Sequence, residues 1–340
     1  MKKWFYIMLC LSLLLLSGCG AGNANNPGTS GNNSAGSPSN QKLQKISLML
    51  DWYPNAVHSF LYAAQANGYF KEQGLDVDIK MPADTNDPLK LVAAGQIDMA
   101  ISYEPEVLVA RGENIPVQSF GALVRHPLNC LMVPADGPIQ SPKDLVGKTV
   151  GYPSIPLDEA IVHTMVTSAG GNPQQVKMVD VGFDLIPAMA TKKTDALIGG
   201  YINHETLLLD KEGHPMRTFN PTKYGVPDYY ELVLVAGEKG IKEKPEVFKK
   251  FMTAIAKGQK YVQDHPDKGL SILLQHEDKS SPLDKGVETK SLQILLPLMD
   301  AKDKPFGYQD AASWENVAKW LYNNKVLKTP VKAQDAFVNF

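Results

Sequence analysis

The chain has 340 residues, of which 44% are hydrophobic and 21% are charged, and its formal net charge is −2 at pH 7. Nucleic-acid binding depends on clustered positive charge, so this balance argues against a nucleic-acid partner. The part of the chain after residue 41, roughly 300 residues, is longer than one average domain and suits two lobes.

The first 18 residues have the pattern of a secretory signal peptide. Lys2 and Lys3 form a short positive region, and residues 4–16 form an apolar run that is followed by Ser17, Gly18 and Cys19. The run is shorter than the roughly 20 residues that span a bilayer. Small residues before a cysteine resemble a bacterial lipobox, which implies cleavage before Cys19 and lipid attachment to its thiol. The alternative is a plain signal peptide with an incidental cysteine.

Residues 19–41 are predicted to form a tether. After Cys19 they consist mostly of Asn, Gly, Ser and Pro. Such a composition buries too little apolar surface to offset the entropy of an unfolded chain. We therefore expect a lipid-anchored, extracytoplasmic protein whose folded part works in solvent.

The rest of the chain alternates strand-like and helix-like patterns. Apolar runs, helical spacing and Gly or Pro at the ends of segments predict the order βαβαβ twice. This order predicts a mostly parallel sheet covered by helices. The first set of segments is 46–50, 55–67, 75–79, 87–94 and 97–102, and the second is 149–152, 157–168, 176–181, 185–191 and 196–198.

Two further apolar runs, 130–133 and 232–236, are predicted to connect the lobes. This places lobe 1 at 42–131 plus 237–340, lobe 2 at 132–231 and a hinge crossing at 232–236. The C-terminal part shows helical spacing at 245–265, 287–296 and 311–323, with Pro297 as the expected stop of the middle helix. A cleft between two hinged lobes is a preferred ligand site.

The candidate site residues follow the predicted strands, because ligands of open α/β sheets bind beyond the carboxyl ends of the strands. Asn55 and His58 could line the cleft or lie on a solvated helix face, and Trp52 could contact a ligand or pack in the core. The segments supply Trp52, Asn55, His58, Tyr103, Glu104, Ser154, Tyr201, Asn203 and Glu205.

These residue types favour a neutral or amine-bearing heteroaromatic ligand. Aromatic rings stack on flat ligands, and carboxylates accept hydrogen bonds from amino groups. The chain contains only Arg111, Arg125 and Arg217, whereas planar anions are typically bound by arginine. Common catalytic motifs are absent, and Cys130 is the one cysteine after Cys19, so we expect no catalytic residue, no metal site and no cofactor.

Four stretches of sequence resemble the thiamine-pyrimidine family, which includes bacterial binding proteins for thiamine pyrimidine precursors and fungal pyrimidine synthases. The opening is Leu-Asp-Trp-x-Pro-Asn-x-x-His at 50–58, followed by Gly-Tyr-Phe-x-x-x-Gly-Leu-x-Val at 68–77. Gly-x-x-Asp-x-Ala-Ile-Ser-Tyr-Glu at 95–104 and Gly-Tyr-x-Asn-x-Glu at 200–205 continue it. The segment at 68–77 is shared with sulfonate, taurine and nitrate binding proteins.

The resemblance implies a two-lobed α/β periplasmic-binding-protein fold of type II that delivers a ligand to an ABC transporter permease. It implies that Trp52 and one tyrosine, for which we choose Tyr201, sandwich an aminomethyl-pyrimidine or its formyl derivative, and that Asn55 and Glu205 hydrogen-bond it. Glu104 and Ser154 are weaker candidates by position. A monomer suits such delivery.

Two other functions stay open at this stage. One is the same fold with a sulfonate, nitrate or another small anion as ligand. The other is a pyrimidine synthase, because His58 matches the histidine that the fungal relatives consume. Those enzymes use pyridoxal phosphate and iron and carry a cysteine-rich segment, and this chain has no such segment.

Overall fold

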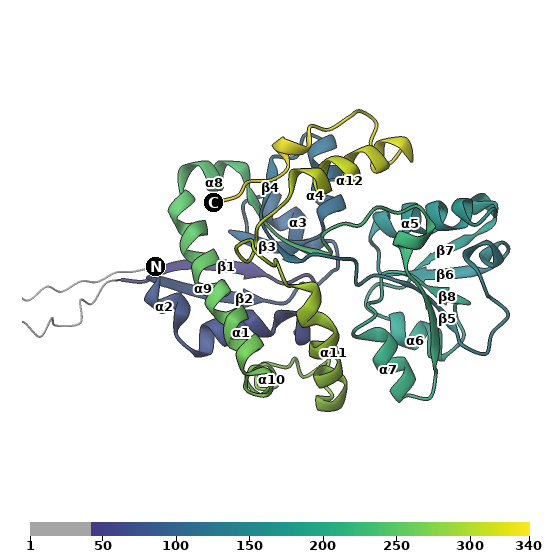
Figure 1. Ribbon diagram of the computed structural model, residues 1–340, viewed down its shortest axis with the longest axis horizontal. Helices are drawn as coiled ribbons and strands as arrows, with labels where there is room; N and C mark the ends of the chain where they lie inside the picture. The colour runs from purple at the N-terminus through teal and green to yellow at the C-terminus, as the bar shows by residue number, and fades with distance from the viewer. Residues whose placement is uncertain (1–41) are drawn as a thin grey trace, which may run out of the picture. The chain divides into compact units, whose positions relative to one another are not determined.

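The computed structural model describes residues 42–340, so the predicted signal peptide (1–18), the lipidation site Cys19 and the tether (19–41) lie outside the described residues. Within 42–340 the strands form two five-stranded sheets, each with its own helices (Figure 1). We call the first sheet with its helices lobe 1 and the second lobe 2. The two-lobed α/β fold was predicted correctly.

The sheet of lobe 1 has the order β2-β1-β3-β10-β4. Strands β1 to β3 are parallel, as the βαβαβ pattern predicts, and β10 pairs antiparallel with both β3 and β4. The strands are β1 (Gln44–Met49), β2 (Leu75–Lys80), β3 (Met99–Ser102), β4 (Val117–Val124) and β10 (Leu232–Gly237).

The sheet of lobe 2 repeats this plan with the order β7-β6-β8-β5-β9. Strands β6, β7 and β8 are parallel, and β5 pairs antiparallel with β8 and β9. The strands are β5 (Leu131–Pro134), β6 (Thr149–Tyr152), β7 (Lys177–Asp180), β8 (Ala196–Leu197) and β9 (Met216–Phe219).

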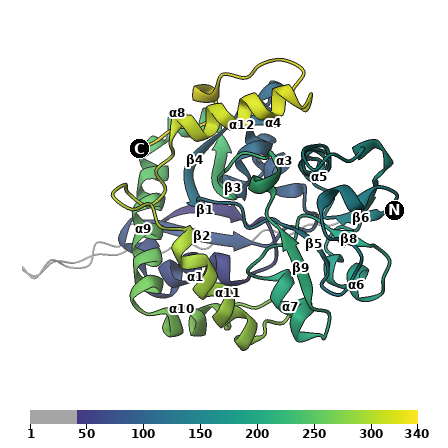
Figure 2. The ribbon, with the colours of Figure 1, turned by 45° about the vertical axis from the view of Figure 1, so that its right-hand side comes forward.

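Helices cover both sheets, and the turned view in Figure 2 shows α5, α6 and α7 with lobe 2. Lobe 2 contains α5 (Pro156–Ser168), α6 (Leu185–Ala190) and α7 (Glu205–Lys211). Lobe 1 contains α1 (Ser59–Ala66), α2 (Tyr69–Glu72), α3 (Asp87–Ala93), α4 (Glu104–Gly112), α8 (Glu238–Glu243), α9 (Pro245–Asp264), α10 (Pro266–Leu273), α11 (Lys285–Leu298) and α12 (Ala311–Asn323). The 3-10 turns are η1 (Ala56–His58), η2 (Pro142–Leu145), η3 (Pro173–Gln175), η4 (Pro221–Tyr224) and η5 (Ala333–Asp335).

Residues 232–236 lie elsewhere than predicted, because they form most of β10 within the sheet of lobe 1. A strand that is buried on both faces has a continuous apolar sequence. That pattern was interpreted as a segment that crosses between the lobes. Likewise 131–133 belong to β5 of lobe 2. The chain passes between the lobes at 125–130 and again at 225–231.

The two crossings are bonded to each other. The carboxylate of Glu231 accepts the backbone N–H groups of Leu128 and Asn129 at 2.7 and 2.9 Å. His126 Nδ1 lies 2.9 Å from the Asp228 carboxylate. The crossings therefore form one paired hinge rather than two independent linkers.

Helix α11 continues through Pro297, which was predicted to stop it, and ends at Leu298. Pro297 lies one residue before the end of the helix, so its missing N–H bond and the clash of its ring affect the last turn alone. Helix α9 packs closely on α1, because Gly258 lets the two backbones approach. A Cβ atom at position 258 would lie 2.2 Å from the carbonyl oxygen of Phe60.

We expect Gly258→Ala to lower the free energy of unfolding by about 1–3 kcal/mol, because the added methyl group must push α1 and α9 apart. Urea denaturation of residues 42–340 measures this. The matched control is Gly240→Ala in α8, where the nearest atom would be Phe248 Cζ at 3.8 Å, so no loss is expected. Equal stability of the two variants would contradict this account of the helix packing.

Candidate ligand-binding site

The loops that follow β1, β3, β6 and β8 meet between the lobes, as expected for the carboxyl ends of parallel strands. They enclose two small cavities of about 20 Å³ each, which share Tyr103, Ile155, Gly199 and Tyr201. The aromatic cavity is lined in addition by Asp51, Trp52, Asn55, Pro153, His204 and Glu205. The acidic cavity is lined in addition by Asn129, Leu157, Asp158, Tyr229 and Glu231.

Each cavity has room for about one water molecule. A pyrimidine ring is larger than that, so it enters only if the lobes move apart at the hinge.

Trp52 extends from lobe 1 against lobe 2. Its ring lies 4.4 Å from the ring of Phe183, measured between centroids, at an angle of 52°. The indole Nε1 of Trp52 and the hydroxyl of Tyr201 are both buried without a hydrogen-bond partner. Buried polar atoms are normally paired, so these two donors at one cavity mark a place for a ligand acceptor or a water.

Asn55 lines the aromatic cavity, but its side chain is also the cap of η1. Its Oδ1 accepts from the backbone N–H of Val57 at 3.0 Å, and its Nδ2 donates to the Tyr53 carbonyl at 3.2 Å. Its amide therefore has only part of its hydrogen-bonding capacity left for a ligand.

His58 does not line either cavity. It is fully buried, and its Nδ1 accepts from the backbone N–H of Asn55 at 3.2 Å. The other nitrogen, Nε2, then carries the proton and donates to Asp51 at 2.9 Å. Both nitrogens are used by the chain, so His58 fixes the loop after β1.

Glu205, at the start of α7, lines the aromatic cavity, and both of its oxygens already have protein partners. Oε2 accepts from the backbone N–H of Tyr201 at 2.7 Å, and Oε1 lies 2.9 Å from His204 Nδ1. Burial would raise the pKa of Glu205, but His204 and these hydrogen bonds outweigh it and lower the pKa. Glu205 is therefore an ionised carboxylate.

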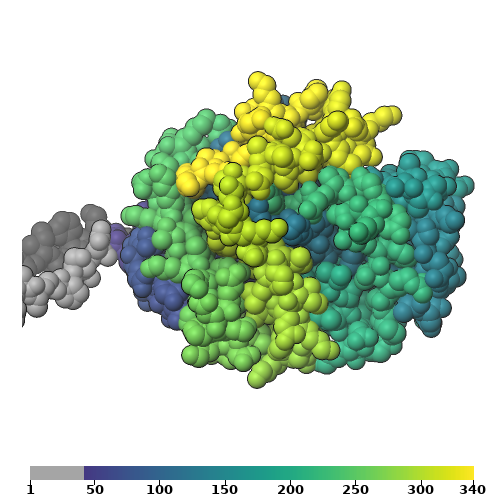
Figure 3. Space-filling view, in the orientation of Figure 1, coloured from purple at the N-terminus to yellow at the C-terminus, as the bar shows by residue number. Residues whose placement is uncertain are grey.

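His204 connects the lobes. Its Nε2 lies 3.5 Å from Glu288 of α11, whose other oxygen accepts from the backbone N–H of Ala56 at 2.8 Å. Burial would lower the pKa of His204, but Glu205 and Glu288 outweigh it and raise the pKa to about 10. A buried imidazolium between two carboxylates thus joins α7 of lobe 2 to α11 of lobe 1, which meet on the face in Figure 3.

Three predicted site residues make contacts outside both cavities. The Asn203 Nδ2 group donates to Ser291 of α11 at 2.9 Å, which is a second link between the lobes. The Ser154 hydroxyl donates to Asp180 at 2.5 Å. Glu104 lines neither cavity, and its carboxylate accepts from the backbone N–H of Tyr230 at 2.7 Å.

The sequence did not single out Asn129, Asp158, Tyr229 or Glu231, which line the acidic cavity. Burial raises the pKa of Asp158 to about 8 and that of Glu231 to about 7. Among the described residues that line the two cavities there is no lysine or arginine. The cleft is therefore aromatic and acidic.

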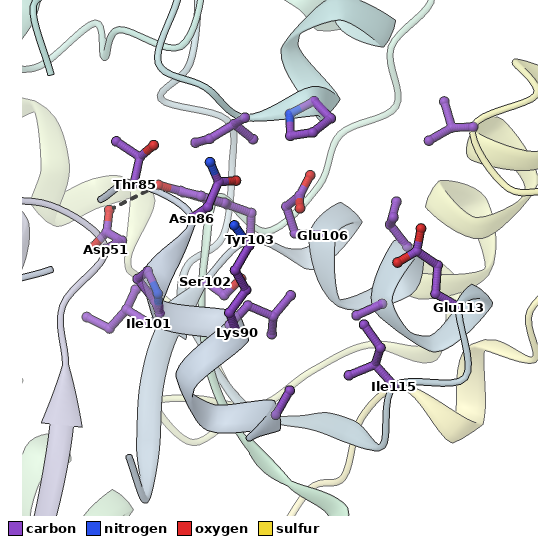
Figure 4. A pocket seen from close by; sticks show the side chains of 18 residues that line it. Asp51, Thr85, Asn86, Lys90, Ile101, Ser102, Tyr103, Glu106, Glu113 and Ile115 are labelled. Carbon is purple, nitrogen blue, oxygen red and sulfur yellow. Dashed lines mark hydrogen bonds between the residues drawn. The ribbon is translucent and has the colours of Figure 1, made fainter. Parts of the chain in front are cut away.

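A third cavity, of about 400 Å³, lies beside the cleft between α3, α4 and the start of α5. Tyr103 stands between this cavity and the aromatic cavity, with its hydroxyl 3.5 Å from Asp51 (Figure 4). Of the predicted site residues, only Tyr103 lines this third cavity.

Residues 42–340 contain no cluster of His, Cys, Asp and Glu side chains that could hold a metal ion. In the same residues, no helix is both long and apolar enough to cross a membrane.

The fold and the cleft define a two-lobed binding protein of the periplasmic type. A solved structure with this architecture, the alkanesulfonate-binding protein SsuA from Xanthomonas axonopodis pv. citri, superposes with a TM-score of 0.70 at 13% identity, over 87% of this chain and 98% of that one. At that identity the likeness shows the fold alone.

Residues 55–269 match the family model described as NMT1/THI5 like, and the chain belongs to this family. A "Formylaminopyrimidine-binding protein" of Halalkalibacterium halodurans is 46% identical over 99% of this chain and 98% of the relative. A "4-amino-5-hydroxymethyl-2-methylpyrimidine phosphate synthase" of Legionella pneumophila is 24% identical over 87% of this chain and 91% of the relative. The family resemblance found in the sequence is confirmed.

The link through His204 leads to a pH-dependent prediction. The pKa of His204 in the folded chain, about 10, is above the 6.5 of a free histidine, so its stabilising effect is fully present below pH 6.5 and is lost as the pH rises through 10. We expect His204→Gln to cost about 3 kcal/mol of unfolding free energy near pH 6, because two buried carboxylates lose their cation.

This cost should shrink steadily when urea denaturation is repeated at pH 8 and pH 10. The control is His214→Gln, an exposed histidine of lobe 2, which should change little at any of these pH values. A cost for His204→Gln that is the same at pH 6 and pH 10 would be inconsistent with a charged link.

Proposed function

We propose that this protein is an extracytoplasmic solute-binding protein of an ABC importer and that it binds a thiamine pyrimidine precursor, in aminomethyl or formylaminomethyl form, for thiamine salvage. The observation that carries the proposal is the 46% identity over nearly the whole length to a formylaminopyrimidine-binding protein. The name of that relative supports the ligand, and the periplasmic-binding-protein fold supports a transporter permease as partner and a location outside the cytoplasm.

The chemistry of the cleft supports an aminopyrimidine ligand. Trp52, Tyr103 and Tyr201 offer flat faces to the ring, and the surrounding carboxylates offer acceptors to its amino groups. The predicted sandwich of the ligand between Trp52 and Tyr201 remains a proposal, supported by the place of both rings at one cavity. Asn55 and Glu205 line the same cavity as candidate polar contacts.

A small anion is the second candidate, because SsuA, the structural relative, is an alkanesulfonate-binding protein. The lining of the cleft argues against it. A sulfonate or nitrate would be placed among Asp51, Asp158 and Glu231 with no lysine or arginine in the cavity lining. The cation that does line the aromatic cavity, His204, is already paired with Glu205 and Glu288.

We also propose that the protein is not an enzyme, although the Legionella relative is named as a synthase. A histidine that is consumed in a reaction must be reachable by its co-reactants. His58 has 0% exposure, and both its ring nitrogens are bonded to the chain. Its role in holding the loop after β1 accounts for its presence.

For the N-terminus we propose a cleaved signal peptide (1–18), lipid attachment at Cys19 and a flexible tether to residue 41. These features lie outside the described residues and are supported by the sequence pattern alone. A lipid anchor would keep the binding protein, as a monomer, close to the permease that it serves.

We expect residues 42–340 to bind one molecule of N-formyl-aminomethyl-pyrimidine or aminomethyl-pyrimidine in native mass spectrometry, in competition with thiamine and taurine. Trp52→Ala should weaken binding by about 1–3 kcal/mol in calorimetry, because one stacking face is lost.

Tyr322→Ala, which removes an aromatic ring that is 44% exposed on α12, is the control and should leave the affinity unchanged. Binding of taurine without binding of any pyrimidine would favour the anion alternative. Pyrimidine binding that is unaffected by Trp52→Ala would remove Trp52 from the site.

We expect Cys19→Ser in the full-length chain to release the protein from the membrane, since lipid attachment needs the thiol. Fractionation of the expressing bacterium into membrane and soluble material, with a labelled fatty acid, measures this. Cys10→Ser, within the predicted signal peptide, is the matched control. A Cys19→Ser variant that stays labelled and membrane-bound would mean that the anchor lies elsewhere.

A further inference from the structure

Asp158 is a buried carboxyl group with one oxygen free. It lies in the first turn of α5 and is 2% exposed. Oδ1 accepts from Asn129 Nδ2 at 2.8 Å, whereas Oδ2 is buried without a partner. Asp158 lines the acidic cavity together with Tyr103, Gly199 and Tyr201.

The orientation of this carboxyl group is fixed by its neighbours. Asn129 Oδ1 accepts from the backbone N–H of Gly199 at 2.9 Å, so the amide of Asn129 must direct its NH₂ group toward Asp158. This bond holds Oδ1 and leaves Oδ2 free. Gly199 has a φ of +87°, and a Cβ atom there would lie 2.8 Å from Oδ2. Glycine therefore keeps the approach to Oδ2 open.

Burial raises the pKa of Asp158 to about 8, Asn129 lowers it, and the nearby Glu231 and Glu106 raise it further, so without a ligand the group is mostly protonated near pH 7. A donor at Oδ2 favours the ionised form, so a ligand amino group that binds there would displace this proton to solvent. Within residues 42–340 no lysine or arginine forms an ion pair with Asp158. An unpaired buried acceptor costs free energy, and a ligand donor would recover it.

Glu205, the carboxylate that the sequence predicted as a ligand contact, is less available. Its two oxygens already accept from Tyr201 and His204. The aromatic and acidic cavities share four lining residues, so a ring stacked near Trp52 and Tyr201 can extend a substituent toward Asp158.

We infer that Asp158 is a specificity-determining residue of the cleft, whose Oδ2 accepts a hydrogen bond from the exocyclic amino group of a heteroaromatic ligand. This inference rests on the proposed function. It adds a contact that neither the sequence nor the family relationship assigned. It predicts a preference for amino-substituted rings, because an exocyclic oxygen at that place would meet a second acceptor.

The test is Asp158→Asn, which keeps the shape of the side chain. The Asn129 NH₂ group requires an oxygen at the Oδ1 position, so the new amide must turn its own NH₂ group into the cavity. A donor would then face the amino group of the ligand. We expect the affinity for 4-amino-5-(formylaminomethyl)-2-methylpyrimidine, the proposed ligand, to fall roughly tenfold to a hundredfold.

The same titrations with an analogue that has hydrogen in place of the amino group form a double-mutant cycle. The wild-type chain should lose affinity for the analogue, and Asp158→Asn should bind it no worse than the amino compound. Asp136→Asn, at an exposed position of lobe 2, is the charge-matched control and should behave as wild type. Thermal melting of each variant shows that it is folded.

The outcomes separate the inference from the proposed function. If wild type binds no pyrimidine, the proposed function fails. If wild type binds and folded Asp158→Asn binds within twofold of it, or if the losses from variant and analogue simply add, the assignment of Asp158 is overturned. Should Asp158→Asn not fold, the analogue is compared on Asp158→Ala instead, where absence of coupling to the amino group likewise overturns it.

Discussion

The return of the chain to its first sheet is the constraint on which the rest of the structure depends. Strand β10 lies between β3 and β4, so the chain must cross between the lobes twice, and Glu231 bonds one crossing to the other. In each lobe the parallel strands then end toward the same cleft. Glu231 also lines the acidic cavity, so the hinge and the cleft floor are built from the same residue.

The cost of burying acids explains how the cleft is arranged. Asp51, Glu205 and Glu288 each have a histidine beside them, and the one between the two glutamates is held as a cation. Asp158 and Glu231 have only amide, backbone and phenol donors, and burial raises the pKa of both. A buried carboxylate that is paired with a histidine stabilises the fold, whereas a buried carboxyl group with a free oxygen can still accept a hydrogen bond from a ligand. This difference separates the contacts that hold the lobes from the surface that recognises a molecule.

The alternation of apolar runs and helical spacing was enough to predict the parallel strands and most helices of both lobes, because these elements bury continuous apolar faces. Strands β4 and β9 were missed, since Gly121 interrupts one and the other is mostly half-buried. In the cleft, Tyr103 and Glu104 show that a sequence pattern predicts the position of a loop but not the direction of each side chain. They are neighbours, but Tyr103 lines the cavities and Glu104 bonds to Tyr230 instead. Asp158 and Asn129 are brought together by the crossing at 125–130, which no local pattern reveals.

The contacts between the lobes surround the cleft rather than fill it. His204 and Asn203 reach α11, and the Thr85 hydroxyl reaches the Pro153 carbonyl at 2.7 Å. A flat ligand would displace aromatic contacts such as that between Trp52 and Phe183, while the polar links around the rim could form again after closure. A flat ligand that bears donors would leave these links free to form, whereas an anion would be placed among the buried carboxyl groups. Hinge closure and recognition thus depend on two kinds of buried acid: Glu205 and Glu288, which share the His204 cation, and Asp158, which has a free oxygen.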